Sequence, residues 1–241
     1  MQDEFKITAI PLKRILKIAV YLPNDYYKND DNYPLVIALD GQFLFKFFDE
    51  DNRKIDLSTY LKESDRRFIV ISLFSPRLDI PEWRISELNP YYMGNNDKID
   101  SSYAYNFSNY LVNELIPLLK TKYRFNDDIY LFGINEACIS SIYMLYTFNI
   151  FMGAILFSPK INDCNHKFLE DIDMRFDKNK KLYLYMGGKN INDNEENQFY
   201  DLSASITKRN PDYFILDYNQ DKDNEIETIS EYINKGLDII K

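Results

Sequence analysis

Short hydrophobic runs alternate with segments of helical periodicity along most of the chain. Apolar and β-branched runs predict strands at 16–22, 34–39, 68–73, 130–132, 154–157, 182–185 and 213–216. Apolar spacing predicts a helix over 103–120, which Pro117 kinks or breaks locally, a second helix from Glu136, and a terminal helix over 226–240. This alternation indicates βαβ units, and therefore a mostly parallel sheet with helices on both faces in a single domain over 1–241.

Two segments between the predicted strands are less regular. Residues 43–48 and 57–61 can form helical turns. Residues 75–100 are polar, contain Pro76, Pro81, Pro90 and the only tryptophan, and are predicted to form an irregular loop. In parallel sheets, binding sites gather beyond the carboxyl ends of the strands. The turns that follow the predicted strands are therefore where a site is expected.

The segment from Ala137 to Pro159 contains no charged residue and is about as long as a membrane-spanning helix. Serine, threonine, asparagine and glycine residues interrupt it. A buried helix, a short connection and a buried strand explain this composition better than a membrane span does. No membrane association is expected.

Composition and charge exclude several classes of partner. The net charge is −9, whereas proteins that bind nucleic acid usually present clustered lysine and arginine. The two cysteines, Cys138 and Cys164, suggest neither a disulfide scaffold nor a zinc site. The acidic N-terminus lacks the basic and apolar regions of a signal peptide. A cytoplasmic protein with reduced thiols and no nucleic-acid partner is expected.

The most informative segment runs from Tyr130 to Tyr143. It predicts a buried strand, a tight turn and an apolar helix, the setting in which a G-x-S-x-G nucleophile elbow exposes its serine. Here the five residues are Gly133-Ile-Asn-Glu-Ala137, so Asn135 replaces the nucleophile. A carboxamide has no oxygen nucleophile that a general base can activate. The larger residues after Asn135 favour a relaxed turn, although asparagine also tolerates positive φ and can keep the turn sharp.

Several segments around this turn carry a family resemblance. They are Arg14–Pro23, Tyr33–Gln42, Glu114–Pro117, Tyr123-Arg124 and Gly153–Pro159. In this order, they resemble the putative-esterase family, the α/β-hydrolase group that contains enterochelin esterases, esterase D and tributyrin esterase. The resemblance covers nearly the whole chain and implies an α/β-hydrolase fold.

The resemblance also implies where a Ser-His-Asp triad would lie. The nucleophile position is Asn135, and the acid position after the 182–185 strand falls on Asn190, with Asp193 as a stand-in. The segment Asp221–Glu225 resembles the one that carries the family's histidine, which places Asp223 at that position. Each position therefore lacks the residue that the family uses.

The resemblance further implies an oxyanion-hole loop at the turn 40–42. The backbone amides of Gln42 and Glu136 are the expected donors, and they can still bind an anion or a carbonyl oxygen.

Other reactive groups offer no replacement triad. His166 is the only histidine and is predicted to be solvated in a polar loop, while Cys138, Ser140 and Ser141 are predicted to pack inside the helix after Asn135. Asp40, Glu136 and Asp223 can gather at the same sheet edge, but they lack the spacing of a glycosidase pair or a metal site. No metal and no cofactor are expected.

Three functions are compatible with these residues. The first is an esterase-like protein without serine-esterase activity that retains a pocket for binding or an interface for regulation. The second is an active hydrolase that uses Asp223 or Glu136 to activate water. The third is an interaction module, such as a homo-oligomer or a partner of another protein, that works through aromatic surface.

Overall fold

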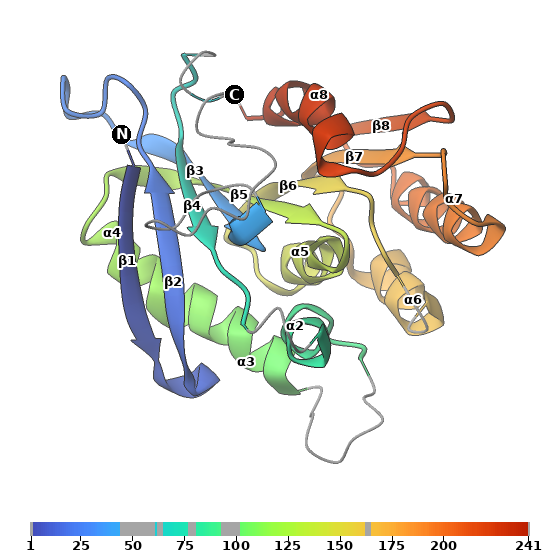
Figure 1. Cartoon of the computed structure of the whole chain (residues 1–241), viewed down its shortest axis with the longest axis horizontal. Coiled ribbons are helices and arrows are strands. Elements are labelled where there is room, and N and C mark those ends of the chain that lie inside the picture. The colour runs from blue at the N-terminus through green and yellow to red at the C-terminus, as the bar shows by residue number, and fades with distance from the viewer. Residues whose placement is uncertain are drawn as a thin grey trace.

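The structure is a computed structural model that describes residues 2–43, 61, 65–76, 81–92, 102–161 and 165–240. Its centre is an eight-stranded sheet in the order β1-β2-β4-β3-β5-β6-β7-β8 (Figure 1). The strands are β1 Gln2–Ala9, β2 Arg14–Tyr21, β3 Tyr33–Leu39, β4 Ile69–Leu73, β5 Phe125–Ile134, β6 Phe151–Phe157, β7 Lys181–Gly187 and β8 Tyr213–Asn219. The pairs β1–β2 and β2–β4 are antiparallel and the others are parallel, which confirms the predicted mostly parallel sheet.

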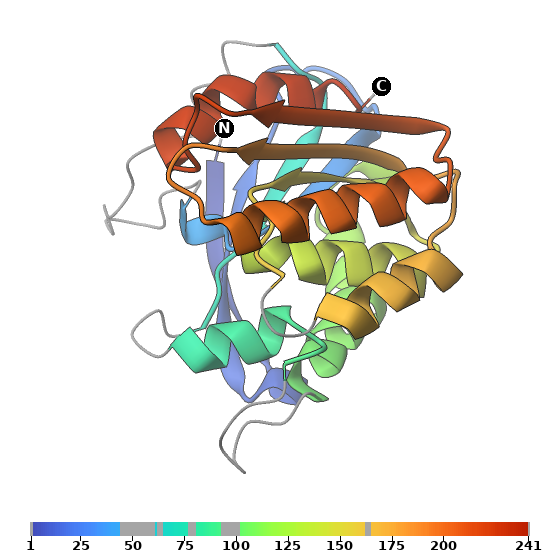
Figure 2. The same cartoon turned by 90° about the vertical axis from the view of Figure 1, so that its right-hand side faces the viewer.

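Helices cover both faces of this sheet, as Figures 1 and 2 show. The helices are α2 Pro81–Leu88, α3 Ser102–Tyr110, α4 Ile116–Lys120, α5 Glu136–Thr147, α6 Asn165–Arg175, α7 Asp193–Lys208 and α8 Ile226–Leu237. Helices α3 to α7 pack on one hydrophobic cluster, whereas α8 packs on a second cluster across the sheet. The central strands are buried on both faces, which explains why their sequences are continuous apolar runs.

The predicted helix over 103–120 is present and is locally broken as expected. A π-helical stretch, η3 Leu111–Leu115, joins α3 to α4, and Pro117 lies in the first turn of α4. Proline lacks the N–H that would bond four residues back, and its ring crowds that carbonyl group. The wider π turn immediately before Pro117 accommodates both effects.

Two sequence predictions were wrong or incomplete. The predicted loop 75–100 contains α2, because Pro81 starts the helix and ion pairs from distant strands hold it. Strand β1 was missed, since its polar residues suit an edge strand paired on one side only. The predicted turns at 43–48 and 57–61 lie outside the described residues, except Phe43 and Leu61.

The charge-free segment behaves as predicted. Helix α5 and strand β6 account for most of it, and both are largely buried in the core. Within the described part of the chain, no helix is long and apolar enough to cross a membrane.

A buried ion pair attaches α2 to the antiparallel side of the sheet. Arg14, the first residue of β2, donates to both carboxylate oxygens of Glu87 on α2, at 2.9 and 2.6 Å. Arg14 also donates to the carbonyl oxygen of Phe74, 3.2 Å away. Burial raises the pKa of Glu87, and Arg14 opposes that shift.

We predict that Arg14→Met lowers the free energy of unfolding by about 3–5 kcal/mol, because it leaves the Glu87 carboxylate buried without its partner. Urea denaturation followed by circular dichroism measures the change. Lys120→Met is the control, since it breaks the exposed pair with Asp127 and is expected to cost about 1 kcal/mol or less. Adding Glu87→Leu to Arg14→Met should restore much of the loss, and equal effects of Arg14→Met and Lys120→Met would contradict the argument.

Candidate functional site

The turn between β5 and α5 keeps the sharp geometry of a nucleophile elbow. Asn135 has φ 55° and ψ −119°, a sparsely populated conformation that costs on the order of 1–3 kcal/mol. Its N–H donates to the carbonyl oxygen of Phe157 at 3.0 Å, and its own carbonyl accepts from the Cys138 N–H at 3.1 Å. The expectation of a relaxed turn was therefore wrong, and the alternative of a sharp turn at asparagine is confirmed.

Close packing behind the turn requires a residue without a side chain at position 133. A Cβ atom on Gly133 would lie 2.6 Å from the Ala137 carbonyl oxygen and 2.9 Å from the Cys138 nitrogen. The fully buried Cys138 thiol donates to the carbonyl oxygens of Gly133 and Phe157, each at 3.3 Å. Burial raises the pKa of Cys138 well above its ordinary value, so it is an inert core residue, as predicted.

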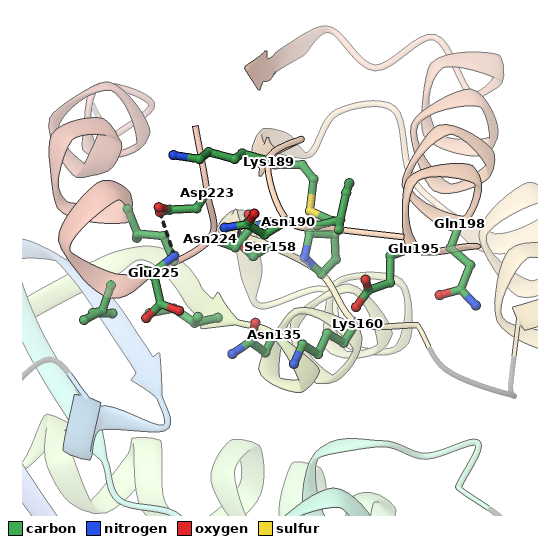
Figure 3. A pocket seen from close by; sticks show the side chains of 16 residues that line it. Asn135, Ser158, Lys160, Lys189, Asn190, Glu195, Gln198, Asp223, Asn224 and Glu225 are labelled. Carbon is green, nitrogen blue, oxygen red and sulfur yellow. Dashed lines mark hydrogen bonds between the residues drawn. The ribbon is translucent and has the colours of Figure 1, made fainter. Parts of the chain in front are cut away.

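A cavity of about 530 Å³ opens above this turn, at the carboxyl ends of the parallel strands. It brings together Asn135, Asn190 and Asp223, the three positions at which the family resemblance places the triad. Figure 3 shows these side chains around one opening. Asp193, the alternative to Asn190, starts α7 and is exposed outside this lining.

The Asp223 carboxylate is directed toward the start of α8. It accepts hydrogen bonds from the Thr228 hydroxyl at 2.5 Å and from the Glu225 N–H at 3.2 Å. These bonds, first that from Thr228, lower the pKa of Asp223 below its ordinary value. Figure 3 shows the Asp223–Glu225 bond as a dashed line. Asp223 therefore lines the cavity but supports the loop before α8 with its carboxylate.

Asn224, which the sequence did not single out, connects three strand ends. Its side-chain oxygen accepts from the Gly187 N–H at 2.8 Å and the Ser158 hydroxyl at 2.6 Å, while its NH₂ group donates to the Gly187 carbonyl at 2.7 Å. The loop after β8 is thus attached to the ends of β6 and β7. Its aspartate and asparagine residues look alike in sequence, so no pattern distinguishes Asn224 from its neighbours.

The predicted oxyanion-hole loop is held by a buried charge cluster. Arg84 of α2 binds the Asp40 carboxylate through Nε, at 2.9 and 3.0 Å, and also through Nη2. Arg84 Nη1 donates to Glu136 at 2.7 Å. Gln42 donates to Asp40 at 3.1 Å and accepts from the Ser75 N–H at 3.0 Å. This network holds the segments that carry both predicted backbone donors.

The acidic partners of Arg84 favour its charged form. Burial disfavours the Arg84 charge, but Asp40 and Glu136 outweigh burial and raise the pKa of Arg84 above its ordinary value. Arg84 therefore faces two carboxylates, those of Asp40 and Glu136. Arg84 was missed from sequence because its segment was predicted to be a loop.

His166 does not line this cavity. It is exposed in the first turn of α6, which corrects the predicted polar loop but agrees with the predicted solvation. It lines a separate cavity of about 400 Å³ together with Asp173 and Asp201, and no residue is common to the two linings. Among the described residues, no group of three or more histidine, cysteine or acidic side chains could hold a metal ion.

Comparison with known proteins agrees with this geometry. The model of the Putative esterase family matches residues 11–209. The chain belongs to this family. No curated protein sequence matches it.

Solved structures show that this Putative esterase family member has the α/β-hydrolase fold. An IroE-like serine hydrolase from Shewanella oneidensis has a TM-score of 0.79 at 14% identity, covering 100% of this chain and 80% of that one. The BES protein from Bacillus cereus has a TM-score of 0.77 at 16% identity, with 100% and 94% covered. The enterobactin esterase FES from Shigella flexneri has a TM-score of 0.77 at 14% identity, but only 58% of that chain is covered.

We predict that Gly133→Ala destabilises this Putative esterase family member by about 1–3 kcal/mol or more, because the added methyl group meets rigid backbone atoms. Urea denaturation provides the measurement. Ser140→Ala is the control in the adjoining helix, since the buried Ser140 hydroxyl has no hydrogen-bond partner among the described residues. If both substitutions are neutral, the close approach behind Asn135 is not required for folding.

We also predict that Asp223→Ala lowers the melting temperature by more at pH 7 than at about pH 3. A folded pKa below the ordinary value of 3.8 stabilises the fold above that value, and this stabilisation is lost as the pH falls through the folded pKa. Thermal unfolding at the two pH values tests the difference. Asp221→Ala, which replaces an exposed carboxylate in the same loop, is the matched control. An unchanged melting temperature for Asp223→Ala at pH 7 would argue against the supporting role.

Proposed function

We propose that this protein is an esterase-family member that has lost serine-esterase chemistry and uses its cavity to bind a small molecule. The observation that carries the proposal is Asn135 in a fully formed elbow. The turn still presents a side chain to the cavity, but that side chain is a carboxamide. Acyl transfer therefore has no nucleophile at the position where the fold would expose one.

Among the described residues, no histidine lines this cavity, which supports the same proposal. His166 lines the other cavity, and the carboxylate at the presumed histidine position, Asp223, has a lowered pKa. A carboxylate whose pKa is lowered is a weaker base, so Asp223 is poorly suited to activating water. The lowered pKa of Asp223 also disfavours the form of the carboxylate-based hydrolase in which Asp223 activates water.

The charged side chains beside the elbow also support the proposed loss of serine-esterase chemistry. The Asp40 and Glu136 carboxylates share one arginine close to the two predicted oxyanion donors. A serine esterase must stabilise negative charge that develops on the substrate oxygen in the transition state. A second carboxylate at position 136 opposes that charge, whereas it does not prevent a neutral ligand from binding.

The cavity lining indicates the kind of ligand. Lys160 and Lys189 stand beside Glu195 and several carboxamides, while Ile134 and Met186 supply apolar surface. The volume of about 530 Å³ lies within the range of small-molecule sites. A compact molecule with polar groups on an apolar body, such as a carboxylic ester that is bound but not cleaved, fits this lining.

We predict that neither the natural protein nor Asn135→Ser hydrolyses p-nitrophenyl butyrate above the rate in buffer, because a serine hydroxyl without a nearby imidazole is not activated. Release of p-nitrophenolate measures the rate, with an intact serine esterase as positive control. Asn135→Ala controls for hydrolysis elsewhere on the surface. Turnover by the natural protein that Asn135→Ala abolishes would overturn the proposal, and turnover by Asn135→Ser alone would reveal another base.

Binding is tested separately with the same ester by saturation-transfer NMR. Gln198→Trp places a large side chain in the cavity wall and is expected to abolish the transfer signal. Asn197→Trp is the matched control, because the adjacent Asn197 is exposed and lies outside the lining. Equal signals in the two variants would exclude the cavity as the binding site for this ester.

A further inference from the structure

The two edge strands of the sheet differ in how strongly their side chains discourage pairing with a strand of another molecule. Edge strand β1 carries Asp3, Glu4 and Lys6, and charged side chains discourage pairing with another strand. Edge strand β8 has the sequence Tyr-Phe-Ile-Leu-Asp-Tyr-Asn, in which Asp217 is the only charged residue and no proline occurs. Its central residue, Leu216, is 45% exposed. An exposed apolar edge strand is a ready template for pairing with another strand.

The outward hydrogen-bonding groups of β8 can be identified. The Asn219 carbonyl accepts from the Gly188 N–H at 2.8 Å and therefore points toward β7. Backbone direction alternates along a strand, so Phe214, Leu216 and Tyr218 direct their N–H and C=O groups away from β7. Figure 2 shows β8 at the front of the molecule, with α7 and α8 on either side of it. Among the described strands, β8 pairs with β7 alone.

We propose that β8 pairs with β8 of a second copy of this chain, antiparallel and centred on Leu216. A twofold axis through the pair would place Leu216 opposite Leu216 and Phe214 opposite Tyr218 of the other copy. These are the residues whose backbone groups point outward, and antiparallel pairing of them forms about six hydrogen bonds. The sheet would continue from one subunit into the next.

The order of residues in β8 favours a second copy over an unrelated strand. Aromatic residues lie two positions before and two positions after Leu216, so the pattern matches itself when it is reversed. Asp217 would face Ile215 of the other copy, and no like charges would lie directly opposite. Within its own subunit, Asp217 binds Lys235 at 2.9 Å and accepts from the Tyr183 hydroxyl at 3.1 Å. The Asp217 carboxylate therefore keeps both of these partners when β8 pairs with a second copy.

Apolar side chains beside the strand would add to this interface. Phe214 and Tyr218 pack on the face of the sheet that α7 covers, and strand alternation places Leu216 on the same face. Tyr200 of α7 is 47% exposed, and its ring centroid lies 5.6 Å from that of Tyr218. Tyrosine is common at protein interfaces because its apolar ring carries a polar tip. The interface thus combines main-chain hydrogen bonds with aromatic contacts.

Sedimentation equilibrium of the full chain tests the proposal. The natural protein is expected to sediment as a dimer with twice the 28.8 kDa chain mass. Leu216→Lys would place two ammonium groups opposite each other and should weaken dimerisation by at least about tenfold. Ile15→Lys is the matched control, because Ile15 is a 60% exposed apolar residue on β2, and this variant should remain dimeric. A natural protein that is monomeric at 100 µM overturns the proposal.

Cross-linking provides a test that does not depend on weakening the dimer. In the proposed register, the two Leu216 Cα atoms are about 5.5 Å apart, which is within the range of a disulfide. Oxidised Leu216→Cys should therefore migrate as a covalent dimer on non-reducing gels. Ile15→Cys and the natural protein, which carries Cys138 and Cys164, should not. If Leu216→Cys cross-links no more than Ile15→Cys, the register is wrong.

Discussion

The backbone of Asn135 is held in a conformation that few residues adopt, and the rest of the candidate site is built on that constraint. The strain, on the order of 1–3 kcal/mol, is offset by the burial of β5 and α5 on either side of the turn. Gly133 allows the chain to turn this closely, and the hydrogen bond to Phe157 ties the turn to the neighbouring strand. The elbow is thus part of the core, which explains how it persists without a nucleophile.

Two networks around the elbow hold loops that an active hydrolase would use for chemistry. Arg84 holds the oxyanion-hole loop and the start of α5 through Asp40 and Glu136. Asn224 joins the loop after β8, which carries the presumed histidine position, to the ends of β6 and β7. Both networks stabilise a defined cavity, and neither includes a histidine side chain. The shape of such a site can be kept while its catalytic residues change, because fold and catalytic chemistry depend on different residues.

The cavity and the exposed sheet edge are linked through α7. The first turns of that helix contribute Glu195 and Gln198 to the cavity wall, while the neighbouring Glu196 accepts from the Tyr218 hydroxyl at 2.6 Å. Tyr218 belongs to β8, so a partner on that edge would support the helix that closes the cavity. Assembly and ligand binding would then share one structural element.

The sequence alone determined the order of strands β2 to β8 along the chain, the α/β class, the elbow position and the absence of a histidine near the C-terminus, but it missed β1. These features follow from local periodicity and from which residue types are present, so no distant contact is needed to predict them. Tertiary structure decided the rest. Helix α2 depends on ion pairs of Arg84 and Glu87 with residues far away in sequence, and the direction of Asp223 depends on Thr228 and the start of α8. Which polar residue of a loop faces a cavity, and which supports the backbone, is set by packing that sequence periodicity does not encode.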